Sequence, residues 1–488
     1  MTICFIGNSF KYETEAVMKL FLPLVTFDFL FEEYPDKEGD ICKVERIPHE
    51  GGYTLSVTIA LGGMTESETM PRSGDFCDKT DEAELCRMLY RIMQRLTGIT
   101  PAWGCLTGIR PVKKVNRLID EGHDKADIFN ILKKEYYVSD EKLELAYQTA
   151  LAQSEPLKAL DKRSYSLYVS VPFCPSRCSY CSFVSHSIES SGAKKLLPQY
   201  VEKLCEEIAE TAAIARELDL RLDTIYIGGG TPTALSAEQL EAVMGAVKKN
   251  FDISKIREYT VEAGRSDTIT EKKLEVIRNF GATRISVNPQ TMNDSVLKAI
   301  GRRHTAEDVV NAFKTARRLG FDNINMDTIA GLPTDTPEGF KHTIETLCGL
   351  DPESITIHTL TVKRSSDLFS KEERNVDSRI GEMVSFGQKK LLETGYLPYY
   401  LYRQKNTVEN LENVGFAKAG YECLYNIYIM EEAQTILAVG AAGSTKLVNT
   451  ETGKIERLFN YKFPYEYISR YGKMMEKKDG ITEFFNNI

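Results

Sequence analysis

The stretch that decides the fold reads Tyr168-Val-Ser-Val-Pro-Phe-Cys-Pro-Ser-Arg-Cys-Ser-Tyr-Cys-Ser-Phe183. Its cysteines, Cys174, Cys178 and Cys181, have the spacing C-x3-C-x2-C directly after a strand-like run over residues 166–171. Thiolates bind soft metals, and iron–sulfur clusters are held by cysteine sulfur. Three ligands on one loop would hold three irons of a cubane cluster and leave the fourth open to a small molecule. The loop therefore predicts a catalytic iron–sulfur site.

Zinc binding and structural thiols are the alternatives for these cysteines. Structural zinc sites take four ligands, often in paired C-x2-C units, and the chain has no second C-x2-C or H-x3-H pair. We expect buried free thiols at the other cysteines of the 11, which are scattered. With no export signal and no disulfide framework in the pattern, we expect a cytoplasmic location.

Length and charge narrow the function classes. At 488 residues the chain is too long for one core, so we expect two or three domains. A net charge of −9 argues against a nucleic-acid partner. No run approaches the roughly 20 apolar residues that are needed to span a bilayer. These features are typical of a globular protein without a membrane span.

The middle of the chain, residues 161–362, alternates between strand and helix patterns. We expect strands at 166–171, 224–228, 259–263, 284–287, 323–329 and 354–360. We expect helices at 198–218, 237–249, 271–280, 306–319 and 337–347. Six strands alternating with helices predict an α/β fold with a parallel sheet, curved into a partial (β/α)6 barrel. The chemistry of such a barrel lies at the carboxyl ends of its strands.

Accessory domains are expected on both sides of this barrel. Residues 1–160 predict an N-terminal α/β domain, with strands at 1–7 and 52–61, a helix at 81–96 and a basic helix after Leu106. The basic helix could hold an anionic partner, or it could be a solvated face. Residues 363–488 predict a C-terminal mixed α+β domain, with a helix at 380–393 and a strand at 396–402.

A second motif, Ile227-Gly-Gly-Gly-Thr-Pro232, ends the second expected barrel strand. Glycines let backbone amides approach a ligand closely, and such a turn suits the amino and carboxylate groups of an amino acid. Glycine turns after strands are also common without any ligand, so the motif gains its meaning from the cysteine loop beside it.

The two motifs together resemble the radical S-adenosylmethionine (SAM) enzymes. Segments 168–173, 228–232, 325–333 and 336–340 resemble the oxygen-independent coproporphyrinogen III oxidase group within them. Leu106-Thr-Gly-Ile-Arg-Pro111 and the long N-terminal domain resemble the HemZ branch of that group. The resemblance implies a [4Fe-4S] cluster, SAM and a tetrapyrrole substrate of heme biosynthesis. It also implies oxidative decarboxylation of coproporphyrinogen III propionates to vinyl groups, with an external flavodoxin- or ferredoxin-type electron donor.

The resemblance also implies roles for particular residues. Cys174, Cys178 and Cys181 would be the cluster ligands. The residues expected to bind SAM are Tyr168, Tyr180, Gly229, Gly230, Thr231, Glu262, Gln290, Arg302, Asp327 and Thr361. As structural alternatives, Glu262 could face a helix dipole, and Arg302 could form an ion pair with Asp327. Arg265 and Arg303 are candidates for binding the carboxylates of the substrate.

Two departures from the group bear on the substrate. In the oxidase a further cysteine stands two residues after the third ligand, where this chain has Phe183. The related heme chaperone HemW carries His-Asn-x-x-Tyr-Trp where this chain reads Tyr425-Asn-Ile-Tyr-Ile-Met430. The histidine that would ligate heme is absent, although His186 is a candidate to replace it. A heme-binding or heme-transfer protein, or a radical SAM enzyme with another substrate, is therefore the alternative to the oxidase.

Overall fold

A computed structural model describes residues 1–33, 39–183, 185–361, 366, 368, 379–404, 407 and 410–487. The chain divides into two compact units, residues 1–147 with 403–411 and residues 148–402 with 412–488. The three-part division expected from the sequence stays a prediction, and its boundary at residue 362 lies outside the described residues.

The first unit is built on a five-stranded sheet in the order β2-β1-β3-β4-β5. Its strands are β1 (Thr2–Ile6), β2 (Asp28–Phe31), β3 (Ile41–His49), β4 (Gly52–Leu61) and β5 (Met64–Ser73). Strand β1 lies between β2 and β3 and is parallel to both, whereas the pairs β3–β4 and β4–β5 are antiparallel. The expected strands at 1–7 and 52–61 are confirmed, whereas β3 and β5 were not expected. Since β5 reads MTESETMPRS and is largely exposed, it lacks an apolar signal.

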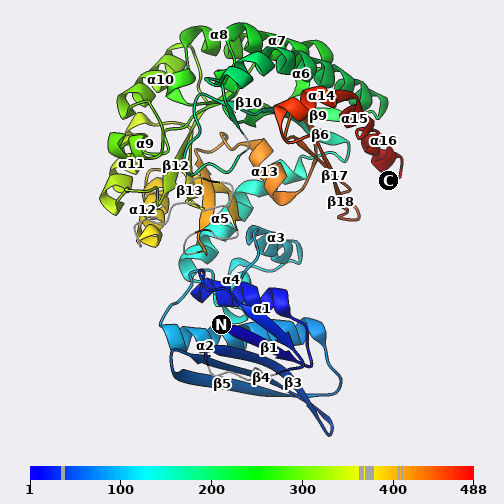
Figure 1. The fold of residues 1–488 in the computed structure, drawn as a ribbon, viewed down its shortest axis with the longest axis vertical. Coiled ribbons are helices and arrows are strands. Elements are labelled where there is room, and N and C mark those ends of the chain that lie inside the picture. The colour runs from blue at the N-terminus through cyan, green and yellow to red at the C-terminus, as the bar shows by residue number, and fades with distance from the viewer. Residues whose placement is uncertain are drawn as a thin grey trace. The chain divides into compact units, whose positions relative to one another are not determined.

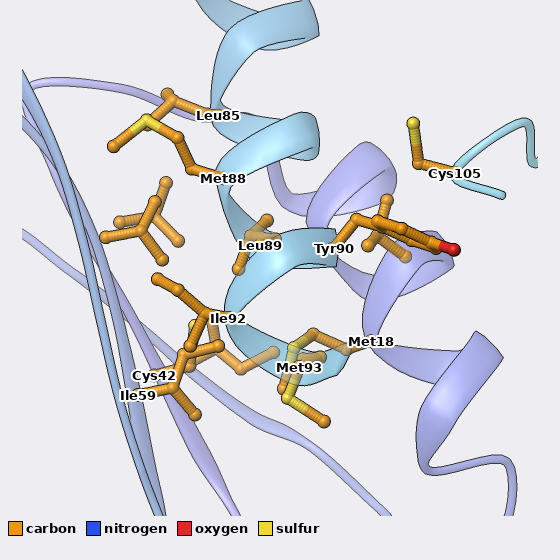
Figure 2. Close-up of a cluster of buried hydrophobic side chains, with 14 of the residues drawn as sticks. Met18, Cys42, Ile59, Leu85, Met88, Leu89, Tyr90, Ile92, Met93 and Cys105 are labelled. Atoms are coloured by element: carbon orange, nitrogen blue, oxygen red, sulfur yellow. The ribbon is translucent and has the colours of Figure 1, made fainter. Parts of the chain in front are cut away.

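Helices α1 (Lys11–Phe21) and α2 (Asp78–Thr97) pack apolar side chains against the sheet and complete this unit's hydrophobic core. The residues Leu85, Met88, Leu89 and Ile92 recur at helical spacing on α2 and are almost completely buried. Figure 2 shows them beside Cys42 and Ile59 of the sheet. The helices that follow are α3 (Val112–Asp120), α4 (Lys125–Tyr136) and α5 (Asp140–Lys158).

Six parallel strands form the barrel sheet of the second unit. In spatial order they are β6 (Ser164–Val171), β9 (Arg221–Gly229), β10 (Glu258–Gly264), β11 (Arg284–Val287), β12 (Ile324–Ala330) and β13 (Ser354–Thr359). Every neighbouring pair is parallel. The expected partial (β/α)6 barrel is therefore confirmed.

Helices cover the outer side of the curved sheet, as Figure 1 shows for α6, α7, α8 and α10. The barrel helices are α6 (Ser191–Glu217), α7 (Ala237–Asn250), α8 (Glu271–Asn279), α9 (Asp294–Ala299), α10 (Ala306–Arg318) and α11 (Pro337–Leu350). Capping boxes start α7 at Ser236 and α10 at Thr305, and Thr336 caps α11 ahead of Pro337. These caps fix where each strand-to-helix loop ends, so the loops gather at the carboxyl edge of the sheet.

The remaining strands extend the barrel sheet at both edges. On one side lie β15 (Glu412–Ala417) and β14 (Leu397–Arg403), and on the other β16 (Thr435–Val439), β17 (Ser444–Val448) and β18 (Ile455–Phe459). The C-terminal helices are α12 (Ile380–Glu393), α13 (Leu424–Glu431), α14 (Pro464–Ser469), α15 (Tyr471–Glu476) and α16 (Asp479–Asn486). The mixed C-terminal segment thus joins the barrel sheet and forms no sheet of its own in the described residues. No described helix has the length and apolarity that crossing a bilayer requires.

Candidate active site

The three cysteines lie on a loop whose two ends are held together by strand pairing and hydrogen bonds. After β6 the chain forms β7 (Phe173–Cys174), which pairs in parallel with β8 (His186–Ser187). The amide of Ile188 donates to Cys174 O at 2.9 Å, and the Ser187 hydroxyl donates to Pro175 O at 2.9 Å. Within the loop, the amide of Cys181 donates to Cys178 O at 3.0 Å. These hydrogen bonds fix the backbone on both sides of the cysteines.

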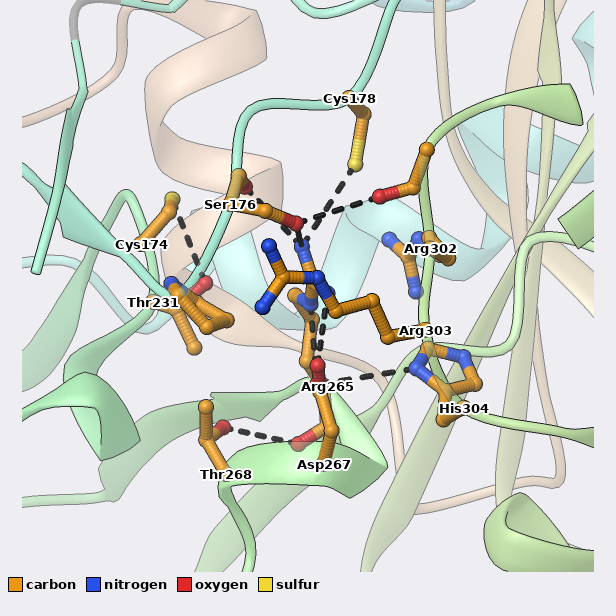
Figure 3. Close-up of polar contacts among 12 residues, drawn as sticks. Cys174, Ser176, Cys178, Thr231, Arg265, Asp267, Thr268, Arg302, Arg303 and His304 are labelled. Atoms are coloured by element: carbon orange, nitrogen blue, oxygen red, sulfur yellow. Dashed lines mark hydrogen bonds and ion pairs between the residues drawn. The ribbon is translucent and has the colours of Figure 1, made fainter. Parts of the chain in front are cut away.

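The surroundings of the sulfur atoms fit an iron–sulfur cluster. Thr231 Oγ1 donates to Cys174 Sγ at 3.4 Å, and Arg265 Nη1 lies 3.9 Å from Cys178 Sγ (Figure 3). Such donors stabilise thiolates and tune clusters. Burial raises the pKa of Cys174, and it raises the pKa of Cys181 to about 11, so metal binding would release protons from these thiols.

The geometry also bears on the zinc alternative. Among the described residues, no three His, Cys, Asp or Glu side chains converge so as to hold a single metal ion. A cubane cluster does not require that convergence, because each cysteine binds a different iron. The donor set of the loop thus fits a cluster better than one ion.

The glycine turn is joined to the cysteine loop by main-chain hydrogen bonds. Gly230 N donates to Val171 O at 2.9 Å, and Thr231 N donates to Phe173 O at 2.7 Å. A Cβ at Gly230 would lie 2.5 Å from Phe173 O, and Gly229 has φ +110°, so neither position suits a side chain. The expectation that these amides face a ligand is wrong for Gly230 and Thr231, whose N–H groups hold the loop. Thr231 O accepts from Ala234 N at 2.8 Å, which leaves the Gly230 carbonyl oxygen as the candidate acceptor for a ligand ammonium.

Glu262 lies on β10 beside this turn. Tyr226 donates its hydroxyl to Glu262 Oε1 at 2.6 Å, and the Gly229 amide is a second donor. A Cβ at Gly228 would lie 3.0 Å from Glu262 Oε2, so that glycine makes room for the carboxyl group. Burial raises the pKa of Glu262 to about 7, and the nearby charge of Asp327 acts in the same direction. These named partners replace the helix-dipole alternative.

Tyr168 belongs to an aromatic stack near Glu262. Its ring stacks on Tyr226 with centroids 6.2 Å apart, and Tyr226 stacks on Tyr425 of α13 at 4.4 Å. Tyr226 was not among the residues predicted from the sequence. Its position two residues before Gly228 on the same strand places both on one face of β9, which is the signal that could have found it.

Asp327, on β12, has neutral and basic donors around it. Asn325 Nδ2 donates to Asp327 Oδ1 at 2.7 Å, and His358 Nε2 lies 3.9 Å from Oδ2. Burial works to raise the pKa of Asp327, but His358 first, and then the hydrogen bonds from Asn325 and Thr356, hold it below its ordinary value. Gln290, with φ +68°, donates its amide to Asp327 O at 2.9 Å, so two predicted site residues meet through the backbone.

Arg302 does not pair with Asp327, so that structural alternative is wrong. Its Nη1 donates to Asn288 O at 2.6 Å, and its Nη2 donates to the hydroxyl of Tyr180 at 3.2 Å. Arg302 is 8% exposed, and its Nε has no hydrogen-bond partner in the described part of the chain. An orphaned donor on a permanent cation suits a carboxylate ligand, such as the amino-acid part of SAM.

Other candidates differ in their outcome. Arg265 is 3% exposed and bonded to Ser176 and Asp267, so the expected substrate contact is wrong for it. Arg303 forms an exposed ion pair with Glu189 and stays a candidate. Thr361 follows β13 and donates its hydroxyl to Thr359 O at 3.3 Å, so its SAM contact also stays a prediction.

The sequence of this chain is also similar to those of known proteins. Residues 168–347 match the radical SAM superfamily model. A protein of Bacillus subtilis (strain 168), named oxygen-independent coproporphyrinogen-III oxidase-like protein HemZ, is 38% identical over 87% of this chain and 86% of its own length. This chain belongs to the HemZ branch of the radical SAM proteins. As a radical SAM protein, it uses a [4Fe-4S] cluster and SAM.

Two further proteins are similar to this radical SAM chain. The heme chaperone HemW of Bacillus subtilis (strain 168) is 32% identical over 62% of this chain and 77% of its own length. The solved structure of the coproporphyrinogen III oxidase HemN from Escherichia coli has a TM-score of 0.50 at 21% identity, covering 66% of this chain and 72% of HemN. At that identity the second likeness concerns the fold.

Proposed function

We propose that this protein is a radical SAM oxidoreductase that converts propionate side chains of coproporphyrinogen III to vinyl groups. Each propionate would lose one hydrogen atom to the SAM-derived carbon radical, then carbon dioxide, and one electron to a one-electron acceptor, and two rounds would give protoporphyrinogen IX. One observation carries the proposal: main-chain hydrogen bonds connect the cysteine loop to the glycine turn, and Arg302 and Glu262 lie at the same edge of the sheet. The likeness to HemZ supports the choice of substrate.

The chain's own residues would bind and orient the cofactors. When bound, the cluster and SAM supply a carbon radical that abstracts hydrogen, after one electron from a flavodoxin- or ferredoxin-type donor. Cys174, Cys178 and Cys181 would hold the cluster. The Arg302 guanidinium would receive the SAM carboxylate, and Glu262 and Asp327 would accept hydrogen bonds from its ammonium or hydroxyl groups.

The heme chaperone is the main alternative, and two positions argue against it. Tyr425, where HemW carries its histidine, is 5% exposed and lies in the aromatic stack. The ring of His186 packs against Phe173 and Phe463, with centroids 6.4 and 6.2 Å away. Burial lowers the pKa of His186, and neither side chain is presented to a macrocycle.

An anaerobic assay of the reconstituted protein with SAM, dithionite and coproporphyrinogen III tests the proposal. We expect deoxyadenosine and protoporphyrin to accumulate together in chromatography. The matched control is Cys178→Ala, which should lose iron and form neither product.

Deoxyadenosine without a change in the porphyrin would reject the decarboxylase and favour another substrate. Stoichiometric heme binding without either product would favour the chaperone. Full iron content and activity in the control variant would reject the cluster assignment itself.

A further inference from the structure

Arg265 ties the cysteine loop to the loop after β10. Its Nη1 donates to Ser176 O at 3.0 Å and to Ser176 Oγ at 2.9 Å, and lies 3.9 Å from Cys178 Sγ. Figure 3 shows the guanidinium reaching from its own loop to this segment. Because Arg265 is 3% exposed, water cannot substitute freely for these contacts. Arg265 is therefore one of the groups that fix the middle of the cysteine loop, together with the hydrogen bonds from Ser176 Oγ to Gly301 O at 3.2 Å and from Ser179 N to Ile300 O at 3.1 Å.

Two further groups, Asp267 and His304, hold the Arg265 guanidinium in place. Asp267 accepts from Arg265 Nε at 3.0 Å and from Nη2 at 2.7 Å, a bidentate pair that fixes the plane of the guanidinium. His304 Nδ1 lies 3.6 Å from Asp267 Oδ1, and His304 is 4% exposed. Arg265 and His304 hold the pKa of Asp267 below its ordinary value against the effect of burial, so Asp267 is an anion.

We propose that Arg265 is a positioning residue that sets both the loop geometry and the reduction potential of the cluster. The proposal rests on the assignment of Cys178 as a cluster ligand. Cluster potentials depend on net charge and on hydrogen bonds to the sulfur atoms. The Arg265 guanidinium places one positive charge beside Cys178, and this charge favours the reduced, more negative cluster. Asp267 offsets part of that charge while it orients the guanidinium.

The arrangement predicts shifts of opposite sign for its two members. Arg265→Gln removes the positive charge and should weaken the cluster's affinity for an electron at least tenfold, about 59 mV more negative for one electron. Asp267→Asn removes the offsetting anion and should shift the potential in the positive direction. Asp267 lines a cleft of about 500 Å³ that also touches Arg303 and Asp308, and the change to Asn keeps the shape of its side chain.

Arg265→Lys separates charge from geometry. Lysine keeps the charge but cannot make the bidentate pair with Asp267, so the potential should stay near wild type while the loop becomes less fixed. Because this variant and Asp267→Asn change little volume, they remain informative if Arg265→Gln fails to fold.

The experiment is a redox titration of the reconstituted full chain, followed by electron paramagnetic resonance of the reduced cluster, with iron content measured in parallel. Support requires a negative shift of the potential for Arg265→Gln together with a positive shift for Asp267→Asn. Where Arg265→Gln does not fold, a near-wild-type potential for Arg265→Lys takes the place of the negative shift. Lower iron content with an unchanged potential in the remaining clusters would reduce Arg265 to a structural residue and overturn the proposal. So would wild-type potentials in all variants. A failure of the cluster assignment is distinct, because Cys178→Ala would then retain full iron.

Discussion

Two carboxyl groups at the same edge of the barrel sheet, on β10 and on β12, have opposite ionisation behaviour. Glu262 sits beside the stacked rings of Tyr168 and Tyr226, and burial raises its pKa to about 7. Asp327 has Asn325 and His358 as neighbours, and its pKa lies below the ordinary value. The donors that neighbouring strands supply, rather than burial alone, therefore decide which carboxyl group is charged.

The largest expected effect that tests this contrast is on the pH dependence of stability. Glu262 is neutral in the folded state up to about pH 7, whereas it ionises near 4.5 when unfolded. Its contribution is therefore fully present below pH 4.5 and is lost as pH rises to 7. Relative to Glu262→Gln, the wild-type free energy of unfolding should fall by about 2 to 3 kcal/mol across this window.

Urea unfolding of the protein without cofactors, followed by circular dichroism at several pH values, measures this difference. The exposed Glu275 on α8 provides the matched control, since Glu275→Gln should leave the pH profile unchanged. Parallel profiles for wild type and Glu262→Gln would show that Glu262 ionises normally and would remove the contrast.

The next effect concerns SAM affinity. Asp327→Ala removes the charged member of the pair and should weaken SAM binding at least tenfold, roughly 1.4 kcal/mol, while iron content stays unchanged. Anaerobic calorimetry on the reconstituted protein measures both affinity and stoichiometry. The control is Asp322→Ala, an exposed aspartate just before β12. Equal affinity in both variants would make Asp327 a structural residue.

A smaller effect isolates the phenol donor of Glu262. Tyr226→Phe removes the 2.6 Å hydrogen bond, which should cost about 1 kcal/mol of stability at pH 8 and move the pKa of Glu262 further upward. Tyr259→Phe is the matched control on the neighbouring strand, because the Tyr259 hydroxyl is buried with no hydrogen-bond partner among the described residues. Should both variants lose the same stability at pH 8, the hydrogen bond would have no special role.

The smallest effect is expected at His358. Its contact with Asp327 is 3.9 Å long and partly exposed, so His358→Gln should change SAM affinity by less than about 1 kcal/mol. The same calorimetric titration measures this change. A loss as large as that of Asp327→Ala would mean that Asp327 binds SAM only while His358 is beside it.

The barrel was largely predictable from the sequence because its signals are local. The strand runs, the helical patterns between them and the two motifs each occupy a short stretch. The antiparallel strand β5 gave no such signal, since its side chains are mostly polar and exposed.

The predicted roles at the site failed where a contact is non-local. Arg265 was a candidate for binding the carboxylates of the substrate, but its partner Ser176 is 89 positions away in the chain. Similarly, the amides of the glycine turn were assigned to a ligand, whereas carbonyl groups of the preceding strand and loop accept their hydrogen bonds. Spacing in the sequence identifies which residues gather, but the partner of each donor depends on the three-dimensional register.

The join at Gly230 has a consequence for how this interior can be altered. Its two hydrogen bonds run between main-chain atoms, and no side chain fits at residue 230. The spacing of the two motifs is thus encoded in peptide geometry, which substitutions among the surrounding side chains leave intact. A pocket for a different substrate could be assembled above this framework without changing the dimensions of the cofactor site beneath it.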